Sequence, residues 1–170
     1  MNSSTIPPGG DLFAPSGDVT ADLYLPDPSL PAAWVVDMDG TLALGRFDEP
    51  GRRGPFDWGR VDEDDPNTPV ITLVRALAAA GHRIVVMSGR SDACRDLTTA
   101  WMRRHQVPHD MLLMRVDGDY RADTDAKVEL FDRHVRHRFH VLGAIDDRDS
   151  VVHLWRRLGL MCAQVAPGDF

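Results

Sequence analysis

The chain has 170 residues, a formal net charge of −7 and 43 % hydrophobic residues, which fits one globular domain with a substantial core. The acidic balance excludes a protein that coats nucleic acid by positive charge alone. No segment approaches the roughly 20 consecutive apolar residues of a membrane-spanning helix and no signal peptide follows Met1, so we expect a soluble, cytoplasmic protein.

The first 31 residues are dense in Pro, Gly, Ser and Asp and show little periodicity, which is typical of an irregular arm. We expect this arm, residues 1–31, to be ordered only in part. The remaining residues, 32–170, alternate short apolar runs with amphipathic stretches. We expect them to form a single domain.

The apolar runs lie at residues 34–36, 83–87, 111–114, 141–145 and 161–165. Each run predicts a buried parallel strand, because it is short and almost continuously apolar. The amphipathic stretches between the runs predict helices at about 69–80, 92–105, 124–137 and 148–158. Alternating strands and helices predict an α/β fold: a three-layer α/β/α sandwich around a central parallel sheet, which is a Rossmannoid architecture.

Polar residues follow three of these runs directly. Asp37, Ser88 and Asp146 each stand at the point where a predicted strand ends. Parallel strands present their carboxyl ends at one edge of the sheet, where open α/β folds bind their ligands. We therefore expect these three side chains, which come from distant parts of the sequence, to lie together in one site.

Two aspartates frame the end of the first predicted strand, in the stretch Asp37-Met38-Asp39-Gly40-Thr41. A strand-end carboxylate such as Asp37 can bind a hard cation and can attack phosphorus to form an aspartyl-phosphate. Asp39 could then protonate the leaving oxygen and afterwards deprotonate water. Taken alone, the pair would also suit a simple Mg²⁺ or Ca²⁺ site, or a cap of the next segment.

The order of these motifs resembles the haloacid dehalogenase superfamily of magnesium-dependent phosphatases, whose first motif is DxDGT after a strand. The resemblance implies that Ser88 hydrogen-bonds the transferring phosphoryl group, and that Lys127 neutralises the nucleophile and the phosphate. Ser88 would also suit the N-cap of the following helix. A lysine on a helix, taken by itself, is usually a solvated surface residue.

The same resemblance implies Mg²⁺ as the cofactor. The acidic doublet Asp146-Asp147 would complete the ion's shell together with Asp37 and the backbone carbonyl of Asp39, because Mg²⁺ prefers oxygen ligands in near-octahedral geometry. We favour Asp147 as the ligand and Asp146 as the residue that supports it. Paired aspartates could instead cap the following helix, a task that would also suit Asp149.

Four longer segments resemble the 3′-phosphatase domain of phage polynucleotide kinase/phosphatase, and the likeness runs from about residue 33 to residue 170. The segments are residues 53–57, 86–90, 145–160 and 164–170. The resemblance implies that Arg53, Arg90 and Asp123 assist catalysis. Guanidinium groups suit this task because their planar fork can hold phosphate oxygens in pairs.

Each of these residues also has a plainer interpretation. Arg53 and Arg90 could form surface ion pairs, and Asp123 could merely cap its helix or orient Lys127. We further expect Thr41, Gly89, Arg53 and Arg90 to contact the substrate.

Between residues 41 and 69 there is room for a small flap but not for a folded cap domain. A site left open can admit the end of a polynucleotide, which favours nucleic acid as the substrate. Phe56 and Trp58 in this flap could stack on a terminal base or could pack against the domain. No GxxxxGK[ST] motif occurs in the sequence, so we expect no 5′-kinase activity from it.

We therefore predict a magnesium-dependent phosphomonoesterase that removes 3′-phosphate from nucleic acid ends or from nucleotides. A small-molecule phosphatase acting on nucleotides or sugars would use the same residues. A non-catalytic module that binds a phosphorylated end is the alternative from another class. A separate kinase or ligase would be a fitting partner.

Overall fold

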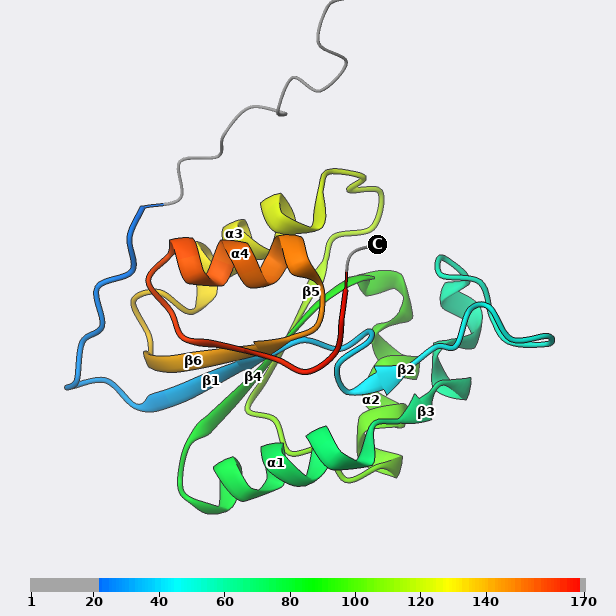
Figure 1. Cartoon of the computed structure of the whole chain (residues 1–170), viewed down its shortest axis with the longest axis horizontal. Coiled ribbons are helices and arrows are strands. Elements are labelled where there is room, and N and C mark those ends of the chain that lie inside the picture. The colour runs from blue at the N-terminus through cyan, green and yellow to red at the C-terminus, as the bar shows by residue number, and fades with distance from the viewer. Residues whose placement is uncertain (1–21, 169–170) are drawn as a thin grey trace, which may run out of the picture.

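The structure, a computed structural model, describes residues 22–168. Five parallel strands form its central sheet in the order β5-β4-β1-β6-β7 (Figure 1). The strands are β1 Ala32–Val36, β4 Arg83–Ser91, β5 Met111–Arg115, β6 His140–Asp146 and β7 Cys162–Gln164. Each of the five apolar runs contributes one strand, so the predicted parallel sheet is confirmed.

The helices cover both faces of this sheet (Figure 1). They are α1 Thr68–Ala79, α2 Arg95–Arg104, α3 Asp123–His134 and α4 Asp149–Arg157, with short 3-10 turns at Trp58–Glu63 and Asp92–Cys94. Helices α3 and α4 lie on one face, and α1 and α2 lie on the other. The three-layer α/β/α sandwich is therefore confirmed.

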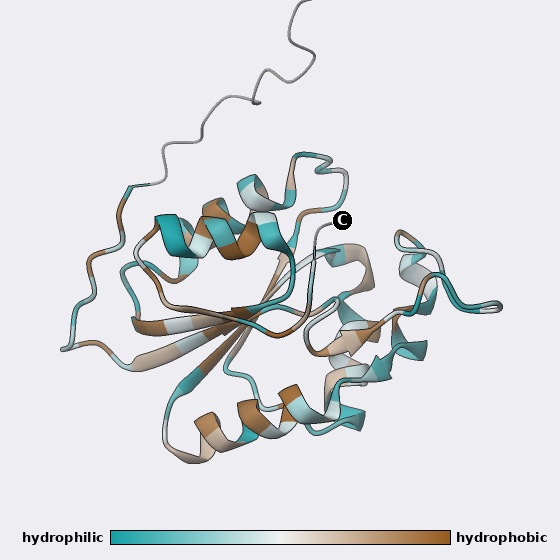
Figure 2. Cartoon of the chain, in the orientation of Figure 1, coloured by the Kyte–Doolittle hydropathy of each residue, from teal (hydrophilic) through white to brown (hydrophobic). Residues whose placement is uncertain are grey.

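Two apolar cores, one on each side of the sheet, explain why the strand sequences lack polar alternation. Val35 and Val85 pack into the core beneath α3 and α4, whereas their neighbours Val36 and Val86 pack into the core beneath α1 and α2. Successive side chains of a strand point to opposite faces, so a strand covered on both faces must be apolar at every position. Figure 2 shows the same pattern, with hydrophobic residues on the strands.

Strand β4 is longer than its apolar run predicts. The run ends at Met87, but the strand continues to Ser91 because β5 keeps pairing with it across an irregularity in register between Ser88 and Ser91. The following helix accordingly begins later than predicted, after a 3-10 turn. The extension matters for the site, because Ser88 and Arg90 are then part of β4 itself.

The predicted arm lies partly outside the described residues, which start at residue 22. Residues 22–31 contain no helix or strand, yet Tyr24 is buried in the core beneath α3 and α4. Its hydroxyl donates to the carbonyl of Phe139 (2.8 Å) and accepts from the backbone N–H of Val141 (2.9 Å). This part of the arm is thus fastened to the domain.

The predicted flap joins β1 to α1. It carries two short strands, β2 Ala43–Leu44 and β3 Asp65–Pro66, which pair antiparallel. The flap contains no folded cap domain, as the sequence predicts. Among residues 22–168, every helix is too short or too polar to traverse a lipid bilayer.

Candidate active site

The carboxyl ends of β1 and β6 bring acidic side chains to one lysine. Asp37 follows β1 directly, Asp146 ends β6, and Lys127 comes from the first turns of α3. The Lys127 ammonium donates to Asp37 Oδ1 (2.6 Å) and to Asp146 Oδ2 (3.0 Å), and all three side chains are buried. Lys127 is therefore not the solvated surface residue that a helical lysine usually is.

A third carboxylate, that of Asp147, completes what we call the carboxylate cluster (Asp37, Lys127, Asp146 and Asp147). One ligand oxygen from each of its three aspartates lies within 4.8 Å of the others. Gly40 permits this arrangement, because a Cβ at that position would lie 2.0 Å from Asp147 Oδ2. Hard oxygen donors at this spacing suit a Mg²⁺ ion.

The two aspartates of the doublet have different surroundings. Asp146 accepts hydrogen bonds from Lys127, from Trp155 Nε1 (3.2 Å), and from the backbone N–H groups of Asp147 (3.0 Å) and Arg148 (3.2 Å). Asp147 Oδ1 accepts from Thr41 Oγ1 (3.1 Å). Asp146 is thus already surrounded by protein donors, which leaves Asp147 better placed to bind a cation.

The electrostatics of the carboxylate cluster show an excess of negative charge. Burial raises the pKa of Asp37 well above its usual range, and the carboxylates of Asp146 and Asp147 raise it further, against the opposing effect of Lys127. Burial and Asp146 also raise the pKa of Asp147. Burial alone would lower the pKa of Lys127, but the carboxylates of Asp37, Asp123 and Asp146 raise it well above its usual value. A bound divalent cation would balance this excess.

The second aspartate of the first motif faces two arginines instead. Arg90 donates from Nε to Asp39 Oδ2 (2.9 Å) and from Nη2 to Asp39 Oδ1 (2.8 Å), which is a bidentate pair. Arg53 Nη2 donates to Asp39 Oδ1 (3.0 Å). Both arginines are buried, with exposed side-chain fractions of 1 % for Arg53 and 0 % for Arg90. The interpretation of these residues as surface ion pairs is therefore wrong.

Asp64 completes this arginine cluster (Asp39, Arg53, Asp64 and Arg90), and it is not among the site residues predicted from the sequence. Its carboxylate accepts from Arg53 Nε and Nη2 (both 2.7 Å) and from Arg90 Nη2 (2.6 Å). It lies in an acidic run that looks like a solvated surface segment. The signal that could have found it is the pair of site arginines, because two buried guanidinium groups need more than one carboxylate.

Ser88 is buried within β4, three residues before the strand ends, and its hydroxyl accepts a hydrogen bond from the backbone N–H of Arg90 (3.1 Å). It does not cap the following helical turn. That role belongs to Ser91, whose hydroxyl accepts from the Ala93 N–H (3.2 Å). The N-cap interpretation of Ser88 is therefore wrong.

Asp123, at the start of α3, orients the lysine from the other side. Its Oδ2 lies 3.5 Å from Lys127 Nζ, and its Oδ1 accepts from Arg115 Nη2 (3.1 Å). Burial would raise the pKa of Asp123, but Lys127, Arg148 and Arg115 together lower it. Gly89 allows the approach, because a Cβ there would lie 2.4 Å from Asp123 Oδ1. Arg115, also absent from the sequence analysis, donates to the Gly89 carbonyl (3.1 Å).

The other residues predicted to contact the substrate differ in how far they are buried. Thr41, expected to contact substrate, is fully buried, and its hydroxyl faces Asp147. In the flap, Phe56 is 80 % exposed and meets the Trp58 ring edge-on at 6.0 Å between centroids. Trp58 packs against the small core of Val61, Cys94 and Met114. Of the two flap aromatics, Phe56 is thus the better placed to stack on a base.

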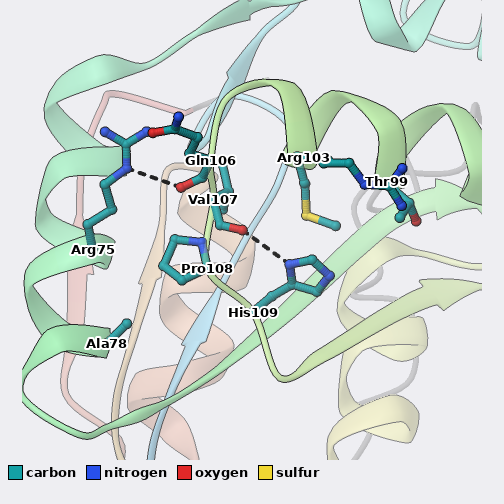
Figure 3. Close-up of a pocket in the computed structure, with 9 residues that line it drawn as sticks. Arg75, Ala78, Thr99, Arg103, Gln106, Val107, Pro108 and His109 are labelled. Atoms are coloured by element: carbon teal, nitrogen blue, oxygen red, sulfur yellow. Dashed lines mark hydrogen bonds between the residues drawn. The ribbon is translucent and has the colours of Figure 1, made fainter.

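A cavity of about 750 Å³ lies away from these clusters, between α1 and the end of α2 (Figure 3). None of the predicted site residues lines it. Arg75 donates from Nε to the Gln106 carbonyl (3.1 Å) and from Nη2 to the His105 carbonyl (2.7 Å). This guanidinium group satisfies carbonyls that the end of α2 leaves unpaired, so its role is structural.

Phosphatases of known structure share this fold. A class C acid phosphatase from Bacillus anthracis shares the fold, with a TM-score of 0.53 at 18 % identity over 72 % of this chain and 53 % of that one. Residues 31–170 match the family model of the polynucleotide kinase PNKP phosphatase domain. The chain belongs to this family and is a phosphatase.

Two proteins are more similar in sequence to this chain than the acid phosphatase is. A protein of Autographa californica nuclear polyhedrosis virus, which bears the name bifunctional polynucleotide kinase/RNA ligase, is 35 % identical over 151 residues, covering 87 % of this chain. A chain in the structure of the Pnkp1/Rnl/Hen1 complex superposes with a TM-score of 0.81 at 38 % identity over 90 % of this chain. This chain spans only 20 % of the viral protein and 51 % of the chain in the complex.

Proposed function

We propose that the protein is a Mg²⁺-dependent phosphomonoesterase that removes 3′-phosphate from nucleic acid ends or nucleotides. The observation that carries the proposal is the position of Asp37, which accepts a hydrogen bond from Lys127 and lies beside the Asp146-Asp147 doublet. Asp39, two residues further on, is held by two arginines. A nucleophile, a second carboxylate and cationic groups that stabilise a phosphate are thus assembled in one site.

In the first step, Asp37 attacks phosphorus in line with the 3′ oxygen. The bond from carboxylate oxygen to phosphorus forms while the bond from phosphorus to the 3′ oxygen breaks, which leaves an aspartyl-phosphate and requires a proton for the departing hydroxyl. Asp39 supplies that proton. In the second step, Asp39 takes a proton from water, which attacks phosphorus and releases inorganic phosphate and the free Asp37 carboxylate.

The arginine cluster holds Asp39 in place for this cycle. Arg90 donates two hydrogen bonds to the Asp39 carboxylate and Arg53 donates one. The same guanidinium groups can donate to the oxygens of a substrate phosphate. They would then hold the phosphoryl group beside Asp39 and stabilise its negative charge.

We propose Asp37, Asp147 and the backbone carbonyl of Asp39 as the protein ligands of Mg²⁺. The fit rests on the spacing of the carboxylates and on their uncompensated negative charge. The bound ion would supply charge neutralisation at the phosphoryl group. Asp146 supports Asp147 because its carboxylate accepts a hydrogen bond from the backbone N–H of Asp147. Thr41 orients the Asp147 carboxylate by donating a hydrogen bond to it.

Around this centre we assign the remaining predicted residues. Lys127 neutralises Asp37 and the transferred phosphate, and Asp123 orients Lys127. Ser88, in β4, donates its hydroxyl proton to a phosphoryl oxygen, and the neighbouring Gly89 leaves room for Asp123.

The open flap and its exposed phenylalanine support nucleic acid as the substrate. The small size of the flap leaves the site without a cap that would enclose a small molecule, and Phe56 presents an exposed ring on which a base can stack. The viral relative is named a polynucleotide kinase/RNA ligase, and a second structure of the Pnkp1/Rnl/Hen1 assembly describes it as an RNA repair complex, so both names favour a nucleic acid substrate. We further propose that residues 32–170 form the phosphatase domain and work beside a kinase or ligase.

The test is phosphate release, in the presence of Mg²⁺, from four substrates offered at equal concentration. They are a 3′-phosphorylated oligonucleotide, the same oligonucleotide with a 5′-phosphate, a 3′-mononucleotide and a sugar phosphate. We expect the 3′-phosphorylated oligonucleotide to give the highest kcat/KM. A preference for the sugar phosphate would replace this proposal with a small-molecule phosphatase, and the absence of hydrolysis of any substrate would leave a binding module.

A further inference from the structure

The C-terminal segment, residues 164–168, runs beside the loop that carries Asp147. Strand β7 pairs with β6 in parallel, and Gln164 is the register partner of Asp146. The backbone N–H of Val165 then donates to the carbonyl of Asp146 (3.0 Å). The segment therefore leaves the sheet at the same level as the proposed metal loop.

Gln164 fixes the backbone of that loop. Its side-chain amide donates to the carbonyl of Asp147 (2.9 Å) and to Asp149 Oδ1 (2.5 Å). Both contacts use the two N–H groups of one amide nitrogen. The Asp147 peptide is thereby held on one side by Gln164, while the Asp147 carboxylate on the other side meets Thr41.

Gly168 closes the contact at the far end of the segment. Its carbonyl accepts a hydrogen bond from the backbone N–H of Asp149 (2.8 Å), at the start of α4. The N-cap residue of that helix, Arg148, makes no side-chain cap, so Gly168 satisfies an N–H that the helix leaves unpaired. A Cβ on Gly168 would lie 2.2 Å from the Asp147 carbonyl oxygen, so a side chain there would displace either the segment or the loop.

We propose that the C-terminal segment is a positioning element of the metal site, in which Gln164 and Gly168 set the direction in which Asp147 presents its carboxylate to Mg²⁺. The inference rests on the proposed function, because it takes Asp147 as a metal ligand. Gln164 and Gly168 bond only backbone and side-chain groups of residues 147–149 in the contacts described, so they are positioning residues and not catalytic ones.

The experiment measures Mg²⁺ affinity without catalysis, from the rise in melting temperature with Mg²⁺ concentration in the absence of substrate. The variants are Gln164→Met, which keeps the length of the side chain but removes its donors, and Gly168→Ala. Val135→Ala is the matched control, since this buried core residue lies at the far end of α3. The Mg²⁺ dependence of hydrolysis of a 3′-phosphorylated oligonucleotide is measured in parallel.

We expect Gln164→Met to require about tenfold more Mg²⁺ than wild type for half-maximal effect in both measurements, because residues that hold a metal ligand in place typically contribute this much to metal affinity. At saturating Mg²⁺ its rate of hydrolysis should be close to that of wild type. Val135→Ala should lower the melting temperature and leave the Mg²⁺ affinity unchanged. If Gly168→Ala does not fold, Gln164→Met decides alone.

An unchanged Mg²⁺ affinity in Gln164→Met, or an equal change in Val135→Ala, overturns the positioning role. A wild-type protein that binds Mg²⁺ but hydrolyses no 3′-phosphate overturns the proposed function alone, and a Gln164-dependent affinity would then still support positioning. A wild-type protein that binds no Mg²⁺ overturns both.

Discussion

The two aspartates of the first motif lie two residues apart and face opposite electrostatic surroundings. In the carboxylate cluster, Asp37 shares one ammonium group with two further carboxylates. In the arginine cluster, Asp39 and Asp64 face two guanidinium groups, so the charges balance. The first cluster carries an excess of negative charge, whereas the charges of the second balance within the protein.

This difference teaches how one site can separate binding a metal from handling a proton. Buried charges are stable only when they are paired, so the excess carboxylates of the first cluster support the proposed divalent ion there. The balanced second cluster holds its side chains in place before any ligand arrives. Substitutions in the two clusters should therefore have effects of different kinds.

The largest effect is expected for Asp37→Asn. The amide keeps the shape of the carboxylate but removes the attacking oxygen anion, so kcat should fall by more than about 1,000-fold. Phosphate release from a 3′-phosphorylated oligonucleotide measures it, and circular dichroism should show that the fold is retained. Asp132→Asn, at an exposed position of α3, is the matched control and should retain wild-type activity. A variant that kept a tenth of the wild-type rate would exclude Asp37 as the nucleophile.

Asp64→Asn tests the arginine cluster. The change leaves two buried guanidinium groups opposite a single carboxylate, so we expect a loss of about 3 kcal/mol in the free energy of unfolding. Arg53 and Arg90 would lose their fixed directions, and kcat/KM should fall by about 100-fold. Denaturant unfolding and steady-state kinetics measure the two effects. Asp65→Asn, in the neighbouring half-buried ion pair with Arg52, should change both by far less; equal losses would contradict the role of Asp64.

Asp64→Asn should lower the stability of the protein, whereas Asp147→Asn should raise it when Mg²⁺ is absent. Removing one of three crowded carboxylates relieves repulsion, so the metal-free variant should be more stable than wild type. Its Mg²⁺ affinity should fall by more than about 100-fold, because an outer partner alone costs 10 to 100-fold. Thermal unfolding with and without Mg²⁺ measures both. A metal-free variant that was less stable than wild type would remove the contrast between the two clusters.

The affinity for Mg²⁺ should rise with pH, an effect smaller than those of the substitutions above. The pKa values of Asp37 and Asp147 lie above the usual 3.8 in the metal-free protein, so these groups retain protons at pH values where ordinary aspartates are ionised. Because the pKa of each group is higher in the folded than in the unfolded chain, protonation of these groups stabilises the metal-free fold. This stabilisation is fully present below pH 3.8 and is lost as the pH rises through the raised pKa values of the folded protein. Mg²⁺ must displace these protons, so its affinity should rise with pH over that range. Titrations at fixed ionic strength test this; a constant affinity would contradict it.

The smallest effect is expected for Phe56→Ala. Loss of one stacked base should raise KM for a 3′-phosphorylated oligonucleotide by about tenfold and leave KM for a 3′-mononucleotide nearly unchanged. Leu73→Ala, at an exposed apolar position of α1, is the control and should change neither. Equal changes for both substrates would show that Phe56 shapes the site and does not bind the strand.

The sequence predicts the sheet and the convergence of Asp37 and Asp146 because both follow from local patterns. Continuous apolar runs identify strands buried on both faces, and these two aspartates come at the carboxyl ends of two such runs. Lys127 and Asp147 are expected there only from the family resemblance. Asp64 could not be predicted in this way, because the flap that carries it has no periodic pattern. Its contact with Arg90 joins residues 26 positions apart and exists only in the folded chain. The contact of Gln164 with Asp147 is of the same kind.

The central claim, that remote carboxylates converge on one divalent ion, is tested most directly by anomalous diffraction from crystals soaked in Mn²⁺. We predict one strong anomalous difference peak within coordination distance of the carboxylates of Asp37 and Asp147, and no peak at that position in crystals of Asp147→Asn. A peak elsewhere on the chain, or full occupancy that survives the loss of Asp147, would contradict the account.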